Sequence, residues 1–343
     1  MNLSRRQFVQ TAASLPLTAA GLRAADKAMF YGVRMGVQTY SFHDILNDGQ
    51  NHADAIIQKM LACGVTSCEL FSPQIEPAVF VGKLPDPADC AKPLFGCGAD
   101  KGGSQRNPWA WEFRQLSGKA KDEARVKQIK WRETVSLDYF TAIRKKFDAA
   151  GLEIFSYNPI SMDMDWNCSS LEIDRTLQAA KALGCKAVNV SITLNGLKRF
   201  IPLAEKNQIM VAPHGHSLTW DPQHFSTRAT FENAFALSKW VGANLDIGHY
   251  TASNEDAVDF IRAHHARITN LHVKDRQKNK SKDKEDGQNT PFGKGDTPIA
   301  AVLQLLKKEK YAIPAFIEYE YAGTTDPVGE VKKCLDYCKQ ALA

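Results

Sequence analysis

The chain has 343 residues, of which 44% are hydrophobic, so it can form one large domain or two smaller ones around a substantial core. Its 43 basic and 38 acidic side chains leave a net charge of only +5, which argues against a nucleic-acid-binding surface. The 8 cysteines show no CxxC spacing, which excludes zinc ribbons and thioredoxin-like sites, and a chain of this length does not need a disulfide scaffold.

The N-terminal segment resembles a bacterial twin-arginine export signal. Arg5 and Arg6 stand just before Phe8 and a weakly apolar, alanine-rich stretch that runs to about Ala24. We therefore expect residues 1–25 to be a signal peptide and the protein to be periplasmic or otherwise exported through the twin-arginine route. The apolar stretch is too short for a stable membrane span.

Strand-like and helix-like segments alternate from residue 33 onward. In the first half of the chain, the expected strands are 33–40, 66–71, 152–157 and 186–190, and the expected helices are 53–63, 135–149, 170–183 and 195–206. Glu69 lies near the end of the second strand, and Asn158 follows the third.

Residues 73–131 interrupt this alternation after the second strand. They are rich in proline and include Trp131, as well as Cys90 and Cys97, which flank a Pro/Gly-rich loop and would pair only in an oxidising compartment. A loop of this length inside a compact domain usually has a function or some structure of its own. We expect an insertion that forms a lid or rim, with its tryptophans acting mainly as anchors.

The second half of the chain continues the alternation. The expected strands are 209–213, 243–247, 268–273 and 313–319, and the expected helices are 230–240, 298–309 and 328–342. Residues 243–276 form a strand–helix–strand unit, with Ser253 as a plausible helix N-cap, so its two strands should be parallel. The mixed-charge run at 278–287 is expected to be a solvated loop.

Eight strands, each followed by a helix, predict a single-domain (β/α)8 TIM barrel over residues 33–343. A doubly wound sheet would require a glycine-rich phosphate loop after an early strand, and the first strand is followed instead by Ser-Phe-His-Asp. In a barrel of this kind the active site lies at the carboxyl ends of the strands.

Those strand ends are rich in metal-binding and proton-transferring side chains. They carry Glu69, Asn158, His214, His216, Asp246, His249, His272, Lys274, Arg276, Glu318 and Glu320. Carboxylate oxygens and imidazole nitrogens are the usual protein ligands of divalent cations, so we expect a metal site at this rim. His214 and His216 share a face, so either can be a ligand, and Glu318 lies deeper than Glu320.

The motifs LDIGH, NLHVKDR, PFGKGD and FIEYEY occur in this order and are similar to those of the xylose-isomerase-like TIM-barrel superfamily, over roughly residues 33–340. The superfamily includes sugar phosphate isomerases/epimerases, inosose dehydratases and endonuclease IV. The resemblance implies that Asp246, His272 and Glu318 bind a metal and that His249 and Arg276 contact substrate.

One departure from the epimerase pattern concerns the end of the fifth strand. Epimerases carry there a glutamate that is both ligand and base, whereas this chain has His214-Gly215-His216. Relatives that act as inosose dehydratases or keto-sugar lyases have histidine-rich turns at this place, so the resemblance leaves the reaction open between isomerisation and elimination.

The sequence hypothesis is a metal-dependent isomerase or epimerase that removes a proton next to a carbonyl of a sugar or keto-sugar. The metal ligands would be His214, Asp246, His272 and Glu318, and the cation Mn, Co, Zn or Mg. The base would be Glu318, His214 or His216, while His249, Lys274, Arg276 and Glu69 bind substrate.

Three alternatives remain: a dehydratase or lyase on the same site, an exported sugar-binding protein without catalysis, and a nuclease of the endonuclease IV type. A nuclease is disfavoured because the second and third strands end in Glu69 and Asn158 rather than in histidines.

Overall fold

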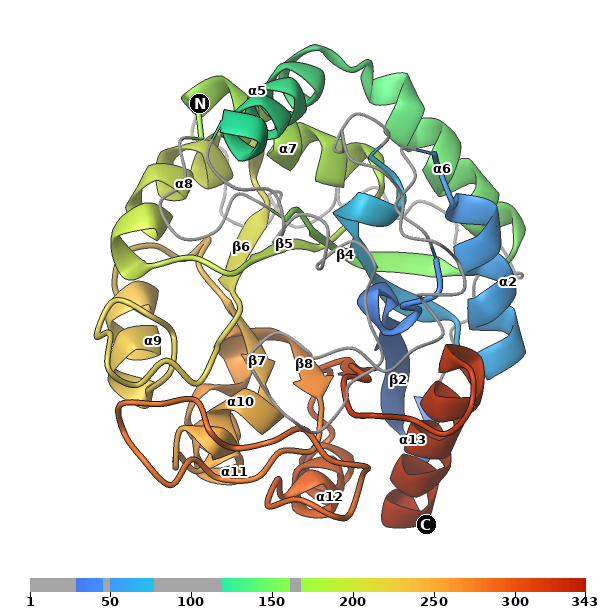
Figure 1. Cartoon of the computed structure of the whole chain (residues 1–343), viewed down its shortest axis with the longest axis vertical. Helices are drawn as coiled ribbons and strands as arrows, with labels where there is room; N and C mark the ends of the chain where they lie inside the picture. The colour runs from blue at the N-terminus through green and yellow to red at the C-terminus, as the bar shows by residue number, and fades with distance from the viewer. Residues whose placement is uncertain (1–28, 46–49, 77–118, 161–167) are drawn as a thin grey trace, which may run out of the picture.

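Eight parallel strands form a nearly closed barrel that is surrounded by helices (Figure 1). The computed structural model describes residues 29–45, 50–76, 119–160 and 168–343. The barrel strands are β2 (Val33–Gln38), β3 (Ser67–Phe71), β4 (Glu153–Asn158), β5 (Ala187–Val190), β6 (Met210–Pro213), β7 (Ala243–Asp246), β8 (Ile268–Val273) and β9 (Ala315–Ile317). A short β1 (Met29–Phe30) pairs antiparallel with β2. The predicted TIM barrel is confirmed.

The strands neighbour one another around the barrel in chain order. Strand β2 pairs with both β3 and β9, so the first and the last barrel strand are joined. Between β6 and β7 the contact consists of two isolated parallel bridges, Val211 with Val241 and His214 with Asn244. The second bridge brings the predicted histidine turn directly beside the strand that ends in Asp246.

The helices form the outer layer of the molecule (Figure 1). They are α2 (Ala53–Cys63), α5 (Lys119–Thr134), α6 (Leu137–Ala149), α7 (Ser170–Ala182), α8 (Leu194–Asn207), α9 (Arg228–Phe235), α10 (Ile247–Ala252), α11 (Ala257–His264), α12 (Ile299–Glu309) and α13 (Pro327–Leu342). Short 3-10 turns follow β2 (Thr39–Ser41), β3 (Ser72–Gln74) and α11 (His265–Arg267). The buried faces of the α-helices pack aromatic and aliphatic side chains onto the sheet, such as Phe140, Phe147, Leu177 and Phe200.

Part of the predicted insertion is helical. Residues 119–131 belong to α5, and Trp131 is partly buried against the core, which agrees with an anchoring role. The predicted signal peptide at 1–25 and the cysteines Cys90 and Cys97 lie outside the described residues.

The strand–helix–strand unit differs from its prediction in one respect. The helix expected to start after Ser253 is α11, and a short helix that the sequence did not predict, α10, precedes it. Helix α10 begins directly after β7 because the side chain of Asp246 accepts a hydrogen bond from the backbone N–H of His249. Ser253 ends this helix, and Asp256 is the N-cap of α11. The site residue Asp246 therefore also starts a helix.

The six cysteines among the described residues, Cys63, Cys68, Cys168, Cys185, Cys334 and Cys338, are buried free thiols. Within the described part of the chain, no helix is both long and apolar enough to cross a membrane.

Candidate metal and substrate site

Four predicted ligands meet at the carboxyl end of the barrel. Asp246 ends β7 and lies beside His272 of β8, while Glu318 directly follows β9 and His214 follows β6. One ligand atom from each of these four side chains lies within 4.8 Å of the other three, and all four side chains are buried. Parallel strands therefore bring together residues that are more than one hundred positions apart.

The donor set fits a divalent cation. Oδ1 of Asp246 accepts the His249 N–H at 2.7 Å, whereas Oδ2 is buried, has no hydrogen-bond partner and lies 3.2 Å from the Lys274 ammonium. A buried carboxylate oxygen without such a partner is costly unless a cation completes it. Two carboxylates and two imidazoles also match the oxygen and nitrogen ligands that Mn, Co and Zn accept.

Lys274 lies in the middle of the carboxylates. Its Nζ is 3.2 Å from Asp246, 2.9 Å from Glu318 and 2.6 Å from Glu320. Burial alone would lower the pKa of Lys274, but the three carboxylates outweigh it and raise the pKa, so the ammonium stays charged. Lys274 therefore supplies positive charge at the place where a cation would be bound.

His272 is held between two carboxylates. Its Nε2 lies 3.0 Å from Glu69 and its Nδ1 lies 3.2 Å from Glu318. Burial opposes a charge on this ring, but the two glutamates raise the pKa of His272 well above 6.5. Burial likewise would raise the pKa of Glu318, whereas Lys274 and His272 lower it well below 4.5. A cation at this site would displace the proton of His272.

Glu69 lies beneath this cluster and has many partners. Its carboxylate is fully buried and accepts hydrogen bonds from polar side chains that point into the barrel, namely Gln38, Ser156, Asn189 and Asn270. Together with the contact to His272 these bonds give the carboxylate five polar partners. The arrangement resembles the carboxylate–histidine pairs that orient metal-ligating imidazoles. The structure thus places Glu69 where it holds His272, below the residues that are open to a substrate.

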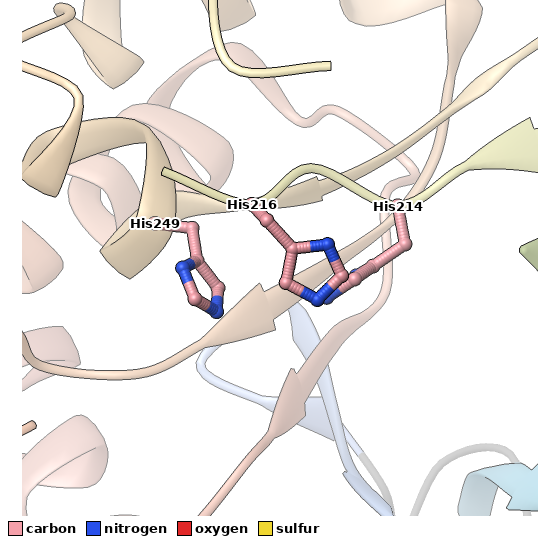
Figure 2. A group of neighbouring side chains, drawn as sticks. All are labelled: His214, His216 and His249. Atoms are coloured by element: carbon pink, nitrogen blue, oxygen red, sulfur yellow. The ribbon is translucent and has the colours of Figure 1, made fainter. Parts of the chain in front are cut away.

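Three histidines form a second group beside the first (Figure 2). Their rings extend in the same direction from two chain segments, the turn after β6 and helix α10. The ring centroids of His214 and His216 are 4.8 Å apart, and those of His216 and His249 are 4.9 Å apart. Gly215 permits the turn, because a Cβ at this position would lie 2.6 Å from the carbonyl oxygen of Phe225. Burial lowers the pKa of His214 to about 4, so its ring is neutral near pH 7.

Arg276 connects His249 to a residue that the sequence did not predict. Its Nη1 lies 2.6 Å from Nδ1 of His249 and 2.9 Å from Oε1 of Glu285. The same Glu285 oxygen accepts a hydrogen bond from Ser217 at 2.5 Å and lies 3.2 Å from Nδ1 of His249. Most of the run 278–287 is exposed, as expected for a solvated loop, but Glu285 turns inward.

All the residues predicted for the site lie at this end of the barrel. The ligand set His214, Asp246, His272 and Glu318 is clustered, with Lys274 in contact with two of its carboxylates, while His216, His249 and Arg276 lie on one side and Glu69 lies below. Two asparagines beside the predicted ligands could have been found from the sequence. Asn270 precedes His272, and Asn244 precedes Asp246, by two positions in an apolar strand, so each asparagine shares a face with that ligand. Glu285 had no such signal.

Fold and site together define a (β/α)8 barrel with a ligand-rich site at its strand ends. The family profile of the xylose isomerase-like TIM barrels matches residues 122–341, which is more than half of the chain, so this chain belongs to that family. The comparison with curated proteins gave no match.

Several solved structures share the fold at low sequence identity. The 3-keto-D-glucoside 4-epimerase YcjR from E. coli is 11% identical with a TM-score of 0.56, over 90% of this chain and 99% of YcjR. The probable 3-DHS dehydratase AsbF from Bacillus anthracis is 12% identical with a TM-score of 0.53, over 88% and 98%. A sugar phosphate isomerase/epimerase from Parabacteroides distasonis ATCC 8503 is 16% identical with a TM-score of 0.52, over 88% and 96%. At these identities the likeness concerns the fold alone.

Proposed function

We propose that this protein is a divalent-metal-dependent enzyme that removes a proton next to a carbonyl of a sugar or keto-sugar, most simply as an isomerase or epimerase. The observation that carries the proposal is the buried set of His214, Asp246, His272 and Glu318, whose ligand atoms lie within 4.8 Å of one another at the carboxyl end of the barrel. The names of the similar structures, two sugar isomerases or epimerases and one probable dehydratase, are consistent with it.

A cation held by these residues would supply Lewis-acid polarisation of a substrate carbonyl. The chain's own groups then have distinct tasks. Glu318 is the proposed base, since its lowered pKa keeps it unprotonated and its contacts to Lys274 and His272 both use Oε2, which leaves Oε1 for another role. Lys274 remains charged, and together with Arg276 it would stabilise oxygen atoms on which negative charge develops.

Elimination is the second candidate reaction, and the position of Glu69 favours it. Epimerisation by a symmetric pair of carboxylates requires two free carboxylates at the site. Glu69 is fully buried and holds Gln38, Ser156, Asn270 and His272, so it is not free to serve as the second base. A site with one carboxylate base and a charged Lys274 suits removal of a proton followed by loss of a neighbouring oxygen substituent, as in a dehydratase or lyase.

Proton NMR in D2O tests this function directly. Protein loaded with diamagnetic Zn²⁺ or Mg²⁺ would be incubated with a panel of sugars, keto-sugars and inososes. We expect deuterium to enter a carbon next to a carbonyl, and the product, an epimer or an unsaturated keto-sugar, to distinguish the two reactions. Glu318→Gln should lower the exchange at least about 100-fold, whereas Glu309→Gln on the outer helix α12 should not change it.

Two results would contradict the proposal. Protein that retains a cation but exchanges no proton with any member of the panel, while still binding one of them, would be a sugar-binding protein. Exchange that survives Glu318→Gln unchanged would remove Glu318 from the role of base.

A further inference from the structure

The three-histidine group contains more ligands than the first cation site uses. His214, His216 and His249 each offer a ring nitrogen, and these three atoms lie within 4.8 Å of one another. His214 belongs to both groups but has only one free nitrogen, because its Nδ1 is 2.6 Å from the side-chain oxygen of Asn244. A single lone pair binds one cation at a time, so His214 serves only one of the two groups. The six side chains of the two groups therefore divide into two sets of three.

We propose that His214, His216 and His249 form a second cation site, next to a first site made by Asp246, His272 and Glu318. The inference deepens the proposed function and rests on it for the first site. Three protein ligands with an open fourth position are the usual arrangement of a catalytic zinc. Two neighbouring sites of this kind would hold two oxygen atoms of one substrate from adjacent positions.

The orientation of the rings supports this division. His214 donates through Nδ1 to Asn244, which directs Nε2 away from the strand. Nδ1 of His249 lies 3.2 Å from Glu285, and a proton on Nδ1 that is donated to this carboxylate leaves the lone pair on Nε2. The alternative tautomer, in which Nδ1 accepts from Arg276 at 2.6 Å, would place the proton on Nε2. A cation requires the first tautomer, so Nη1 of Arg276, which can only donate, must move away from Nδ1 of His249 while it keeps Glu285 as its partner.

The two sites differ in ligand chemistry, and this difference predicts which metals they accept. The first offers two carboxylates and one imidazole and therefore suits Mg²⁺ and Mn²⁺ as well as Zn²⁺ and Co²⁺. The second offers three imidazoles and no oxygen, which favours Zn²⁺ or Co²⁺ and disfavours Mg²⁺ and Mn²⁺. Wild-type protein should therefore bind two zinc ions but one manganese ion per chain.

Metal content tests the proposal without any substrate. Untagged, metal-free protein would be dialysed against Zn²⁺ or Mn²⁺ and analysed by elemental mass spectrometry. We expect His216→Ala to bind one zinc and one manganese, and Asp246→Asn to bind one zinc and no manganese. Glu285→Gln should weaken the second zinc about 10- to 100-fold. His265→Ala, which removes an exposed imidazole on the outer turn after α11, should still bind two zinc ions.

One zinc per wild-type chain would overturn the proposal, and so would two zinc ions in both His216→Ala and His249→Ala. If His216→Ala does not fold, as judged by circular dichroism, His249→Ala and Glu285→Gln carry the test. Manganese binding separates this inference from the proposed function. If the wild type binds one Mn²⁺ in one dialysis and only one Zn²⁺ in the other, the proposed function stands and the second site is contradicted. If the wild type binds no Mn²⁺ but binds a zinc ion that His216→Ala abolishes, the second site stands and the proposed function is contradicted.

Discussion

At the scale of single residues, Lys274 contacts the same carboxylates that a cation would bind. Its ammonium lies 3.2 Å from Asp246 and 2.9 Å from Glu318. Lys274→Met keeps much of the buried side-chain volume but removes the charge, which leaves the carboxylates unpaired in the metal-free protein. We expect Mn²⁺ to bind roughly 10-fold more tightly in titration calorimetry, and the metal-free protein to melt at a lower temperature.

The control for this prediction is Lys278→Met, which changes an exposed lysine outside the cluster. Turnover should fall in Lys274→Met even when the protein is saturated with metal, because the positive charge that would stabilise the substrate oxygen is missing. Unchanged or weaker Mn²⁺ binding in this variant would show that the ammonium does not compete with the cation.

A substitution of Glu69 tests whether this residue binds substrate or supports the ring of His272. Its carboxylate accepts from Gln38, Asn189 and Asn270 and contacts His272. Glu69→Gln would direct an amide N–H₂ at these donors, so at least one buried hydrogen bond is lost. We expect the free energy of unfolding to fall by about 2–4 kcal/mol and metal affinity to fall about 10- to 100-fold.

Kinetics decide between the two roles of Glu69. With metal at saturation, a supporting residue leaves KM nearly unchanged, whereas a substrate ligand raises it. The control is Gln58→Glu on the exposed face of α2, which swaps an amide and a carboxylate away from the site.

At the scale of elements, Asp275 anchors the loop that follows β8. Its Oδ2 accepts the backbone N–H groups of Gly293, Lys294 and Gly295 at 2.7, 3.1 and 3.0 Å, and its Oδ1 accepts that of Thr297 at 3.2 Å. The same loop carries Glu285 to His249 and Arg276. The contacts of His249 and Arg276 with Glu285 therefore depend on the Asp275 carboxylate, which anchors their loop without touching them.

Asp275→Ala should lower the free energy of unfolding by about 2–4 kcal/mol, because several backbone donors lose their acceptor together. Urea denaturation followed by circular dichroism measures this loss. Asp283→Ala, on the exposed part of the same loop, should change stability by less than about 0.5 kcal/mol. A loss that is equal in the two variants would contradict the anchoring role.

The strands and their polar ends could be predicted because buried parallel strands are short apolar runs, and the residue that follows each run must lie at one rim. His214, Asp246, His272 and Glu318 were found in this way. Helix α10 was not predicted, since Asp246 itself caps it and no separate cap residue precedes it. Glu285 was missed because its contact with His249 depends on how a charged loop folds back, which periodicity does not encode.

At the scale of the whole molecule, buried neutral histidines link stability to pH. Burial lowers the pKa of His43 to about 4 from the usual 6.5, and the nearby Glu320 and Asp44 offset this effect only in part. The ring stacks on Tyr319 at a centroid distance of 5.2 Å, and both of its nitrogens lack a hydrogen-bond partner among the described residues. The unfolded chain takes up a proton near pH 6.5, whereas the folded chain does so only near pH 4.

A group whose folded pKa is depressed contributes its full stability above the unfolded pKa and loses it as the pH falls. For His43 the loss begins near pH 6.5 and amounts to about 2 kcal/mol at pH 5. His43→Phe keeps an aromatic ring against Tyr319 and removes this proton site. Urea denaturation of metal-free protein at pH 7 and pH 5 should therefore show a fall in stability that is about 2 kcal/mol smaller in His43→Phe than in the wild type. The control is His265→Phe, which removes an exposed imidazole. If the stability of the wild type and of His43→Phe falls equally between pH 7 and pH 5, His43 does not govern the acid sensitivity of the protein.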